Sequence, residues 1–205
     1  NLTYSVTDAK GRRLVLRRPP LGHVLESAHD MGREHKIISA LFGKGVPVAE
    51  TFGLCSDTDV NEAPFYIMDF VDGPVLHDAE QARLLDTGER TTLSADVVRV
   101  LASLHQLEPD QVGLGDLGRK EAYLARQQKR WTKQWEASKT HDVPEMEETM
   151  RLLSQNMPEQ VGAAVVHGDY RLGNMIVDSG RLAAVLDWEL CTLGDPLADV
   201  GYLLN

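Results

Sequence analysis

The sequence has little cysteine, no long apolar run and fewer basic than acidic residues. Cys55 and Cys191 are its only cysteines, and they form neither a CxxC pair nor a disulfide framework. A reducing, cytoplasmic setting is the simplest expectation, with one disulfide between the two left open. No window approaches about 18 consecutive apolar residues, so we expect no membrane span.

The charge balance is acidic, with 21 basic residues against 31 acidic ones and a formal net charge of −10. This disfavours nucleic acid as a general partner, although a local patch can still be basic. The composition is otherwise that of a globular protein, 42% hydrophobic and 25% charged, and the chain is long enough for one domain or two small lobes. Because the sequence starts at Asn1 and stops within the apolar run GYLLN, we expect it to be a piece of a longer protein.

The first part of the sequence has a strand-rich pattern. The segments LTYSVTD and RRLVLRR flank a Lys10-Gly11 turn, which predicts a hairpin. A loop, PPLGHVLESAHD, precedes the helical spacing of MGREHKIISAL, and Gly43 marks where that helix stops. Two further strands are predicted in VAETFGLCSD and APFYIMDFV.

The pattern changes at Asp72-Gly73-Pro74 and becomes mainly helical. Ser94 is the predicted N-cap of one helix, and residues 119–139 and about 145–157 form two more. Strands return in VVHGD, NMIVD and LAAVLDW, with Ser179-Gly180 as the last turn. We therefore predict an α+β chain in two lobes, residues 1–72 and residues 73–205.

Three polar residues stand beside apolar strands near the end of the chain. Asp169 ends one strand, Asn174 opens the next, and Asp187 ends the hairpin that follows. The hairpin brings Asn174 and Asp187 close together, and such oxygen donors suit Mg²⁺, which takes few protein ligands and substrate phosphates. Asp169 can then accept a proton from an attacking hydroxyl, which is the division of labour that phosphoryl transfer requires.

The pattern HGD-x4-N-x12-D resembles the catalytic segment of the aminoglycoside phosphotransferase and choline kinase group. These small-molecule kinases have a bilobal, protein-kinase-like fold, with a small antiparallel β lobe containing one helix and a larger, mainly helical lobe containing a catalytic hairpin. The resemblance implies that Asp169 is the catalytic base and that Asn174 and Asp187 hold magnesium. The segment GDPLAD resembles the family's brace for the catalytic loop, which assigns structural support to Asp195, Asp199 and His167.

The resemblance extends through the N-terminal lobe and implies ATP as the phosphoryl donor. Arg17 stands where the family has a phosphate-binding lysine, with Arg18 as the alternative if the register slips by one residue. Glu34 is its predicted partner, and the hinge at Asp69, Phe70 and Val71 is predicted to bind adenine. The family's glycine-rich phosphate loop is expected just before Asn1.

The acceptor is predicted to be a small molecule, because seven residues between Asp187 and Asp195 are too few for an activation loop. Residues 119–139 carry seven basic and two acidic residues, a local net charge of +5. Basic residues recur there at helical spacing, whereas Leu124, Trp131 and Trp135 share the opposite side; the basic residues of that face are Arg126, Lys129, Arg130 and Lys133. This arrangement favours an anionic, partly apolar acceptor, or else is only a solvated face. Arg171 is a candidate substrate or phosphate contact, with Asp195 or Asp199 as alternative partners.

The segments LRRPPLGHVL, AHDMGRE and DWELCTLGDPLAD resemble one branch of the family, the phosphotransferase domains found with or fused to acyl-CoA dehydrogenases. This resemblance implies a hydroxyacyl-CoA as the acceptor and an acyl-CoA dehydrogenase domain or partner. Two alternatives are an antibiotic kinase and a non-catalytic module that binds nucleotide without turnover. The arginine in place of lysine favours the latter, and the intact Asp-Asn-Asp set opposes it.

Overall fold

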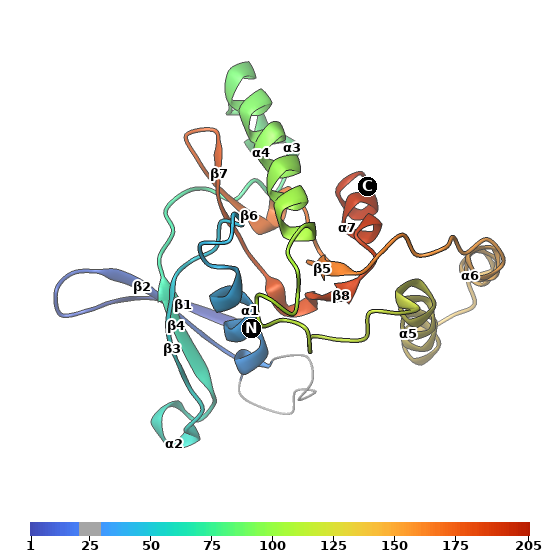
Figure 1. The fold of residues 1–205 in the computed structure, drawn as a ribbon, viewed down its shortest axis with the longest axis horizontal. Coiled ribbons are helices and arrows are strands. Elements are labelled where there is room, and N and C mark those ends of the chain that lie inside the picture. The colour runs from blue at the N-terminus through green and yellow to red at the C-terminus, as the bar shows by residue number, and fades with distance from the viewer. Residues whose placement is uncertain (21–29) are drawn as a thin grey trace.

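The N-terminal part of the molecule is an antiparallel sheet with one helix packed on it (Figure 1). The computed structural model describes residues 1–20 and 30–205. Helix α1 (Met31–Leu41) buries Met31, Ile37, Ile38 and Leu41. The sheet has the order β1-β2-β4-β3 and consists of β1 (Leu2–Thr7), β2 (Arg13–Arg18), β3 (Thr51–Cys55) and β4 (Phe65–Asp69), with the short helix α2 (Thr58–Asn61) before β4. Of the predicted loop PPLGHVLESAHD, residues 21–29 lie outside the described residues.

The register of β2 determines which of its arginines faces the rest of the molecule. Arg17 lies opposite Thr3 of β1 and opposite Tyr66 of β4. Successive side chains of a strand point to opposite faces of the sheet, so Arg17 and Arg18 are separated by the sheet itself.

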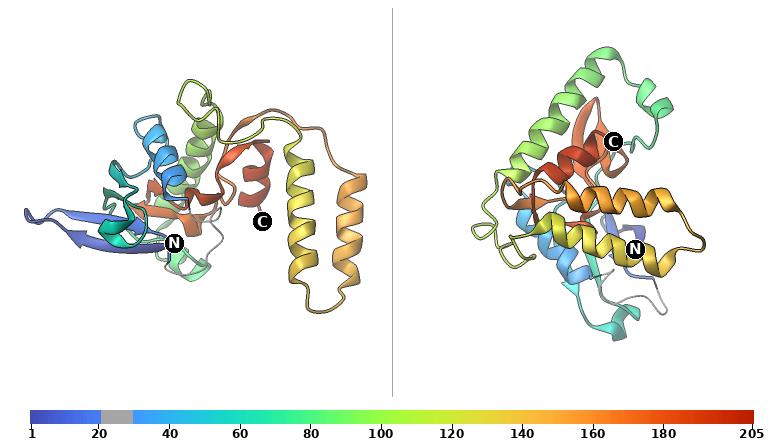
Figure 2. Two further views of the ribbon diagram at one scale, coloured as in Figure 1. Left: turned by 90° about the horizontal axis from the view of Figure 1, so that it is seen from below. Right: turned by 90° about the vertical axis from the view of Figure 1, so that its right-hand side faces the viewer.

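The C-terminal part is mainly helical, and two small antiparallel sheets, β5-β8 and β6-β7, lie within it. Its helices are α3 (Ala79–Arg83), α4 (Thr87–His105), α5 (Tyr123–Ser138), α6 (Pro144–Gln155) and α7 (Leu197–Leu203). Its strands are β5 (Ala164–Val166), β6 (Met175–Asp178), β7 (Arg181–Val185) and β8 (Thr192–Gly194). Helices α5 and α6 lie side by side as a hairpin at one end of the molecule (Figure 2).

The start of α4 differs from the prediction. The N-cap is Asp86, whose side chain accepts the Glu89 amide at 2.8 Å, while the Glu89 side chain accepts the Asp86 amide at 2.8 Å. This reciprocal capping box starts the helix at Thr87, and Ser94 lies inside it. The prediction of Ser94 as the cap was therefore wrong.

The two parts share one hydrophobic core. Ile37 and Tyr66 from the N-terminal part and Leu104 and Trp188 from the C-terminal part belong to the same buried cluster. At the junction, Gly73 has φ 138°, and any side chain there would collide with the Val177 carbonyl.

The structure also bears on the expectations about a disulfide and a membrane span. Cys55 and Cys191 are both free thiols. Among residues 1–20 and 30–205, no helix has both the length and the apolar character needed to cross a membrane.

Candidate active site

Asp199 holds the turn that leads to the predicted catalytic base. The turn follows β5, and the amides of His167 and Gly168 donate to the two carboxylate oxygens of Asp199 at 2.9 and 2.8 Å. Asp199 is fully buried and also lies 2.9 Å from His105 Nε2. Gly168 has φ 86°, a backbone conformation that favours glycine. The turn is therefore fixed in one shape, with Asp169 at its exit.

The His167 ring supports the same turn from inside the protein. Its Nδ1 accepts the Asp169 amide at 3.2 Å, and its Nε2 lies 2.8 Å from the Leu186 carbonyl oxygen. The ring packs edge-on against Trp188, with 4.6 Å between centroids. One nitrogen must accept and the other must donate, so the bonds fit a neutral ring protonated on Nε2. Burial lowers the pKa of His167, which favours this neutral form.

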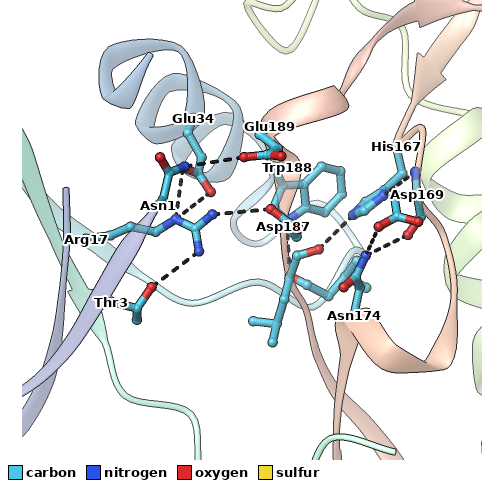
Figure 3. A network of polar contacts seen from close by, with 12 residues as sticks. Asn1, Thr3, Arg17, Glu34, His167, Asp169, Asn174, Asp187, Trp188 and Glu189 are labelled. Carbon is cyan, nitrogen blue, oxygen red and sulfur yellow. Dashed lines mark hydrogen bonds and ion pairs between the residues drawn. The ribbon is translucent and has the colours of Figure 1, made fainter. Parts of the chain in front are cut away.

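The carboxylate of Asp169 is held on both oxygens, and Figure 3 shows its contacts with Asn174. Asn174 Nδ2 donates to Asp169 Oδ2 at 2.7 Å and to its carbonyl oxygen at 2.9 Å. Arg171 Nε donates to Oδ1 at 3.2 Å. A hydrogen bond to Asp169 also raises the pKa of Tyr202 on α7. Tyr202 was not predicted as a site residue, because it stands in an apolar run without a motif.

The two aspartates of the predicted brace have different contacts. Whereas Asp199 binds the turn at His167 and Gly168, Asp195 accepts the amides of Val161 at 3.1 Å and Leu197 at 2.9 Å. Asp195 therefore fixes the chain before β5 and the start of α7. Between described residues, the ion pair of Arg171 is with Asp169 and not with either brace residue.

Arg17 stands between two carboxylates contributed by different elements (Figure 3). Its Nε lies 3.0 Å from Glu34 of α1, and its Nη2 lies 3.2 Å from Asp187 Oδ1. Arg18 points to the other face of the sheet, where its Nη1 donates to Asn61 at 3.1 Å. Of the two arginines proposed for the phosphate-binding position, Arg17 is thus the one that the structure places beside Glu34 and Asp187.

Burial and neighbouring charges shift the pKa values of Arg17 and Glu34 in opposite directions. Burial tends to lower the pKa of Arg17, but the charges of Glu34 and Asp187 outweigh it and raise that pKa. Glu34 is only 3% exposed, and burial raises its pKa against the opposing effect of Arg17. Arg17 therefore remains a fixed cation at neutral pH.

Asp187 adopts an unusual backbone conformation just after the β6-β7 hairpin. Its φ of 66° and ψ of 62° are left-handed, which is uncommon for a residue other than glycine. The Leu186 amide donates to the Asn174 carbonyl oxygen at 2.8 Å, so Asp187 and Asn174 stand on neighbouring segments. Its side chain is 37% exposed, which leaves the carboxylate accessible to a ligand. Strained residues of this kind concentrate at functional sites.

A cavity of about 510 Å³ brings most of these side chains together. It lies between the N-terminal sheet and the β6-β7 hairpin, and its lining includes Arg17, Glu34, Asp69, Phe70, Val71, Asn174 and Asp187. The predicted base, Asp169, is connected to this lining through the side chain of Asn174. The cavity therefore joins the predicted nucleotide residues and the predicted metal ligands in one cleft.

The three backbone amides of the predicted hinge, at residues 69–71, differ in their hydrogen bonds. The Asp69 amide donates to the Glu50 carbonyl at 2.8 Å, and the Phe70 amide donates to the Asp69 side chain at 3.1 Å. Among hydrogen bonds between described residues, the Val71 amide makes none. Val71 is thus the hinge residue whose amide is available to a ligand.

The basic residues predicted to share one face of α5 lie within a regular helix and have different contacts. Arg126 Nη2 donates to the Arg119 carbonyl at 2.7 Å, and the Arg130 guanidinium lies 5.5 Å from the centre of the Trp131 ring. Lys129 and Lys133 line an open groove instead. The four cations lie along one continuous helix but have different neighbours.

Two of the three apolar residues predicted to share the other side of α5 line a cavity. A mainly apolar cavity of about 370 Å³ lies between α5 and α6, and Leu124 and Trp131 line it. Trp135 is not part of this lining, and its Nε1 is buried without a hydrogen-bond partner among the described residues.

A two-lobed fold with a central cleft, a braced aspartate and paired Asn and Asp donors defines the class of kinase-like phosphotransferases. The chain belongs to the phosphotransferase enzyme family, whose model matches residues 1–205. It is 39% identical over 204 residues to mouse acyl-CoA dehydrogenase family member 10, covering 98% of this chain and 19% of the relative. The chain therefore spans about a fifth of the length of that relative.

Solved structures confirm the predicted fold. One is a protein from Ralstonia eutropha JMP134 that is described as an aminoglycoside phosphotransferase. It superposes on this chain with a TM-score of 0.83 at 39% identity, and the match covers 98% of this chain and 59% of the Ralstonia chain. The streptomycin–ATP ternary complex of the aminoglycoside phosphotransferase APH(2″)-IIa gives a TM-score of 0.63 at 22% identity, covering 97% of this chain and 69% of its own. The second likeness is evidence for the fold alone.

Proposed function

We propose that this chain transfers the γ-phosphoryl group of ATP to a hydroxyl group of a small molecule, with magnesium. The observation that carries the proposal is the shared cleft, in which a fixed cation, a hinge and two oxygen donors face one cavity. Membership of the phosphotransferase enzyme family supports it. In this proposal residues 1–72 form the nucleotide-binding lobe and residues 73–205 the catalytic and acceptor lobe.

The nucleotide would lie with adenine at the hinge and its phosphates toward Arg17. The Val71 amide is the available donor for the adenine ring, beside Asp69 and Phe70. The Arg17 guanidinium keeps its charge and can bind phosphate oxygens in pairs, as a lysine ammonium cannot. Glu34 holds that guanidinium from behind at 3.0 Å.

The donor set in the cleft fits magnesium. Asn174 uses its amide nitrogen on Asp169, so its amide oxygen remains for a cation, and Asp187 adds a carboxylate. Hard oxygen donors in small number are typical of Mg²⁺ sites that share a substrate's phosphates. When bound, the ion would neutralise charge on the phosphates.

Asp169 would accept the proton of the acceptor hydroxyl while the hydroxyl oxygen bonds to phosphorus and ADP leaves. The hydrogen bonds from Asn174 and Arg171 hold the carboxylate in one orientation, which favours proton transfer to a positioned acceptor. Arg171 is half exposed and can also turn toward the transferred phosphoryl group or the acceptor.

For the acceptor we propose a hydroxyacyl-CoA-type anion. Acyl-CoA dehydrogenase family member 10 of mouse supports this through its name, and a dehydrogenase domain or partner is proposed on the same basis. The local charge of +5 in residues 119–139 agrees with an anionic ligand, with Lys129, Arg130 and Arg126 as candidate contacts. An aminoglycoside acceptor is the second candidate, because the Ralstonia structure is described as an aminoglycoside phosphotransferase.

An acceptor panel tests the proposal. The purified protein is supplied with ATP and magnesium, together with a 4-hydroxyacyl-CoA, kanamycin or no acceptor. ADP release is followed, and the phosphorylated product is identified by mass spectrometry. We expect product from the acyl-CoA alone, and none without magnesium. Product from kanamycin alone would reverse the order of the two acceptors, and nucleotide binding without product from either would favour a non-catalytic binding module.

A further inference from the structure

Arg33 connects the helix that carries Glu34 to the C-terminal lobe. It is half-buried, and its Nη2 donates to two backbone carbonyls, that of Leu117 at 3.4 Å and that of Cys191. Neither carbonyl belongs to the cleft, and Arg33 is absent from the cavity lining. Two neighbouring residues of α1 therefore have different contacts. Glu34 binds Arg17, whereas Arg33 binds the Cys191 carbonyl of the C-terminal lobe.

The Cys191 carbonyl ends the short turn that begins at Asp187. The turn runs through the 3-10 segment Trp188–Leu190 and closes with a hydrogen bond from the Cys191 amide to the Trp188 carbonyl at 3.1 Å. Its first half is fixed within the C-terminal lobe, because Trp188 Nε1 donates to the Val185 carbonyl at 3.0 Å. Arg33 fixes its far end from the N-terminal lobe.

These contacts connect two charged groups of the cleft, Arg17 and Asp187, to one helix. Arg17 is held through Glu34, and the turn of Asp187 is held through Arg33, at adjacent positions of α1. Lys36 adds a second link, with its Nζ 2.6 Å from Asp116, but both partners are exposed, and exposed pairs contribute little. The half-buried Arg33 is therefore the main polar link.

We infer that Arg33 is a positioning residue that sets the separation between Arg17 and Asp187, so that both face the same phosphates. The inference rests on the proposed function, because it assigns phosphates and magnesium to this cleft. Arg33 touches no substrate in this arrangement. Its removal would let α1 shift away from the Asp187 turn, and small displacements of reacting groups lower rates strongly.

Equilibrium binding of ATP with and without magnesium tests this role. Arg33→Ala and Arg33→Lys are compared with the parent protein and with Lys36→Ala as the matched control on the same helix. For Arg33→Ala we expect the affinity for magnesium-ATP to fall by about tenfold or more, and the affinity for metal-free ATP to fall less. Arg33→Lys should recover part of the loss, and Lys36→Ala should bind as the parent does.

The outcomes separate this inference from the function on which it rests. If Arg33→Ala melts at a lower temperature but each folded molecule binds magnesium-ATP as the parent does, Arg33 is only a structural residue and the inference is overturned. If the parent itself binds no magnesium-ATP, the nucleotide assignment of the cleft fails. A drop in kcat with an unchanged KM for the acceptor in Arg33→Ala would agree with positioning at the phosphates.

Discussion

At the scale of single residues, the turn that leads to Asp169 depends on hydrogen bonds that fix the protonation of His167 as well as its position. His167 must be neutral, because its Nδ1 accepts the amide of Asp169 while its Nε2 faces the Leu186 carbonyl. A second proton would place two donors face to face at Nδ1. The turn that presents the proposed base therefore requires an uncharged histidine.

This requirement predicts a dependence of stability on pH. Burial lowers the pKa of His167 in the folded protein, whereas in the unfolded chain histidine titrates near pH 6.5. As the pH falls below about 6.5 the unfolded chain binds the proton first, so the free energy of unfolding decreases, by at most about 1.4 kcal/mol per pH unit. Urea unfolding of the parent and of His167→Gln measures this slope.

We expect a shallower slope in His167→Gln between about pH 5 and 6.5. His141→Gln, at an exposed position, controls for the loss of a histidine as such. An identical slope in the parent and His167→Gln would show that His167 does not carry the effect.

Single residues differ in how far they could be predicted from the sequence. Asp169, Asn174 and Asp187 could be proposed because their spacing within one short segment is a local property of the chain. The contacts of Tyr202 and Arg33 could not, since their partners Asp169 and Cys191 are distant in sequence and no spacing pattern indicates either contact. Which of Arg17 and Arg18 lies beside Glu34 depends on the register of β2. That register is visible only in the pairing of β2 with its neighbouring strand.

At the scale of elements, the strands and helices were predicted best where apolar periodicity was strong. Helix α4 was placed too late, because its first buried apolar residue is Leu93 and the turns before it are largely solvent-exposed. Those turns depend on the capping box of Asp86 and Glu89, a polar signal that apolar spacing does not report.

The cap of α4 can be tested by paired substitutions. Asp86→Ala removes an N-cap acceptor and should cost about 1 kcal/mol, lowering the melting temperature by about 2–4 °C. Ser94→Ala, at the position first predicted as the cap, lies on an exposed helical surface and should leave stability unchanged or slightly higher. Thermal unfolding followed by circular dichroism compares the two. A larger loss in Ser94→Ala would contradict the observed helix start.

At the scale of the whole molecule, the site exists only where the two lobes meet. Arg17 and Glu34 come from the N-terminal lobe, whereas Asn174 and Asp187 come from the C-terminal lobe. The two-lobed fold could be predicted through the family resemblance, but the individual contacts of the basic residues on α5 could not. The hydrogen bond of Arg126 to the Arg119 carbonyl, for example, joins the helix to a residue before it.

We propose that one cleft binds magnesium-ATP and that Asp169 acts on the acceptor rather than on the nucleotide. The most direct measurement compares parent and Asp169→Asn in the same preparation, for magnesium-ATP affinity and for the rate of phosphoryl transfer to the acceptor identified by the panel. We predict an affinity within about twofold of the parent and a rate lower by about 10²- to 10⁴-fold. An undiminished rate would contradict the role of Asp169, and a loss of affinity equal to the loss of rate would contradict the separation of nucleotide binding from proton transfer.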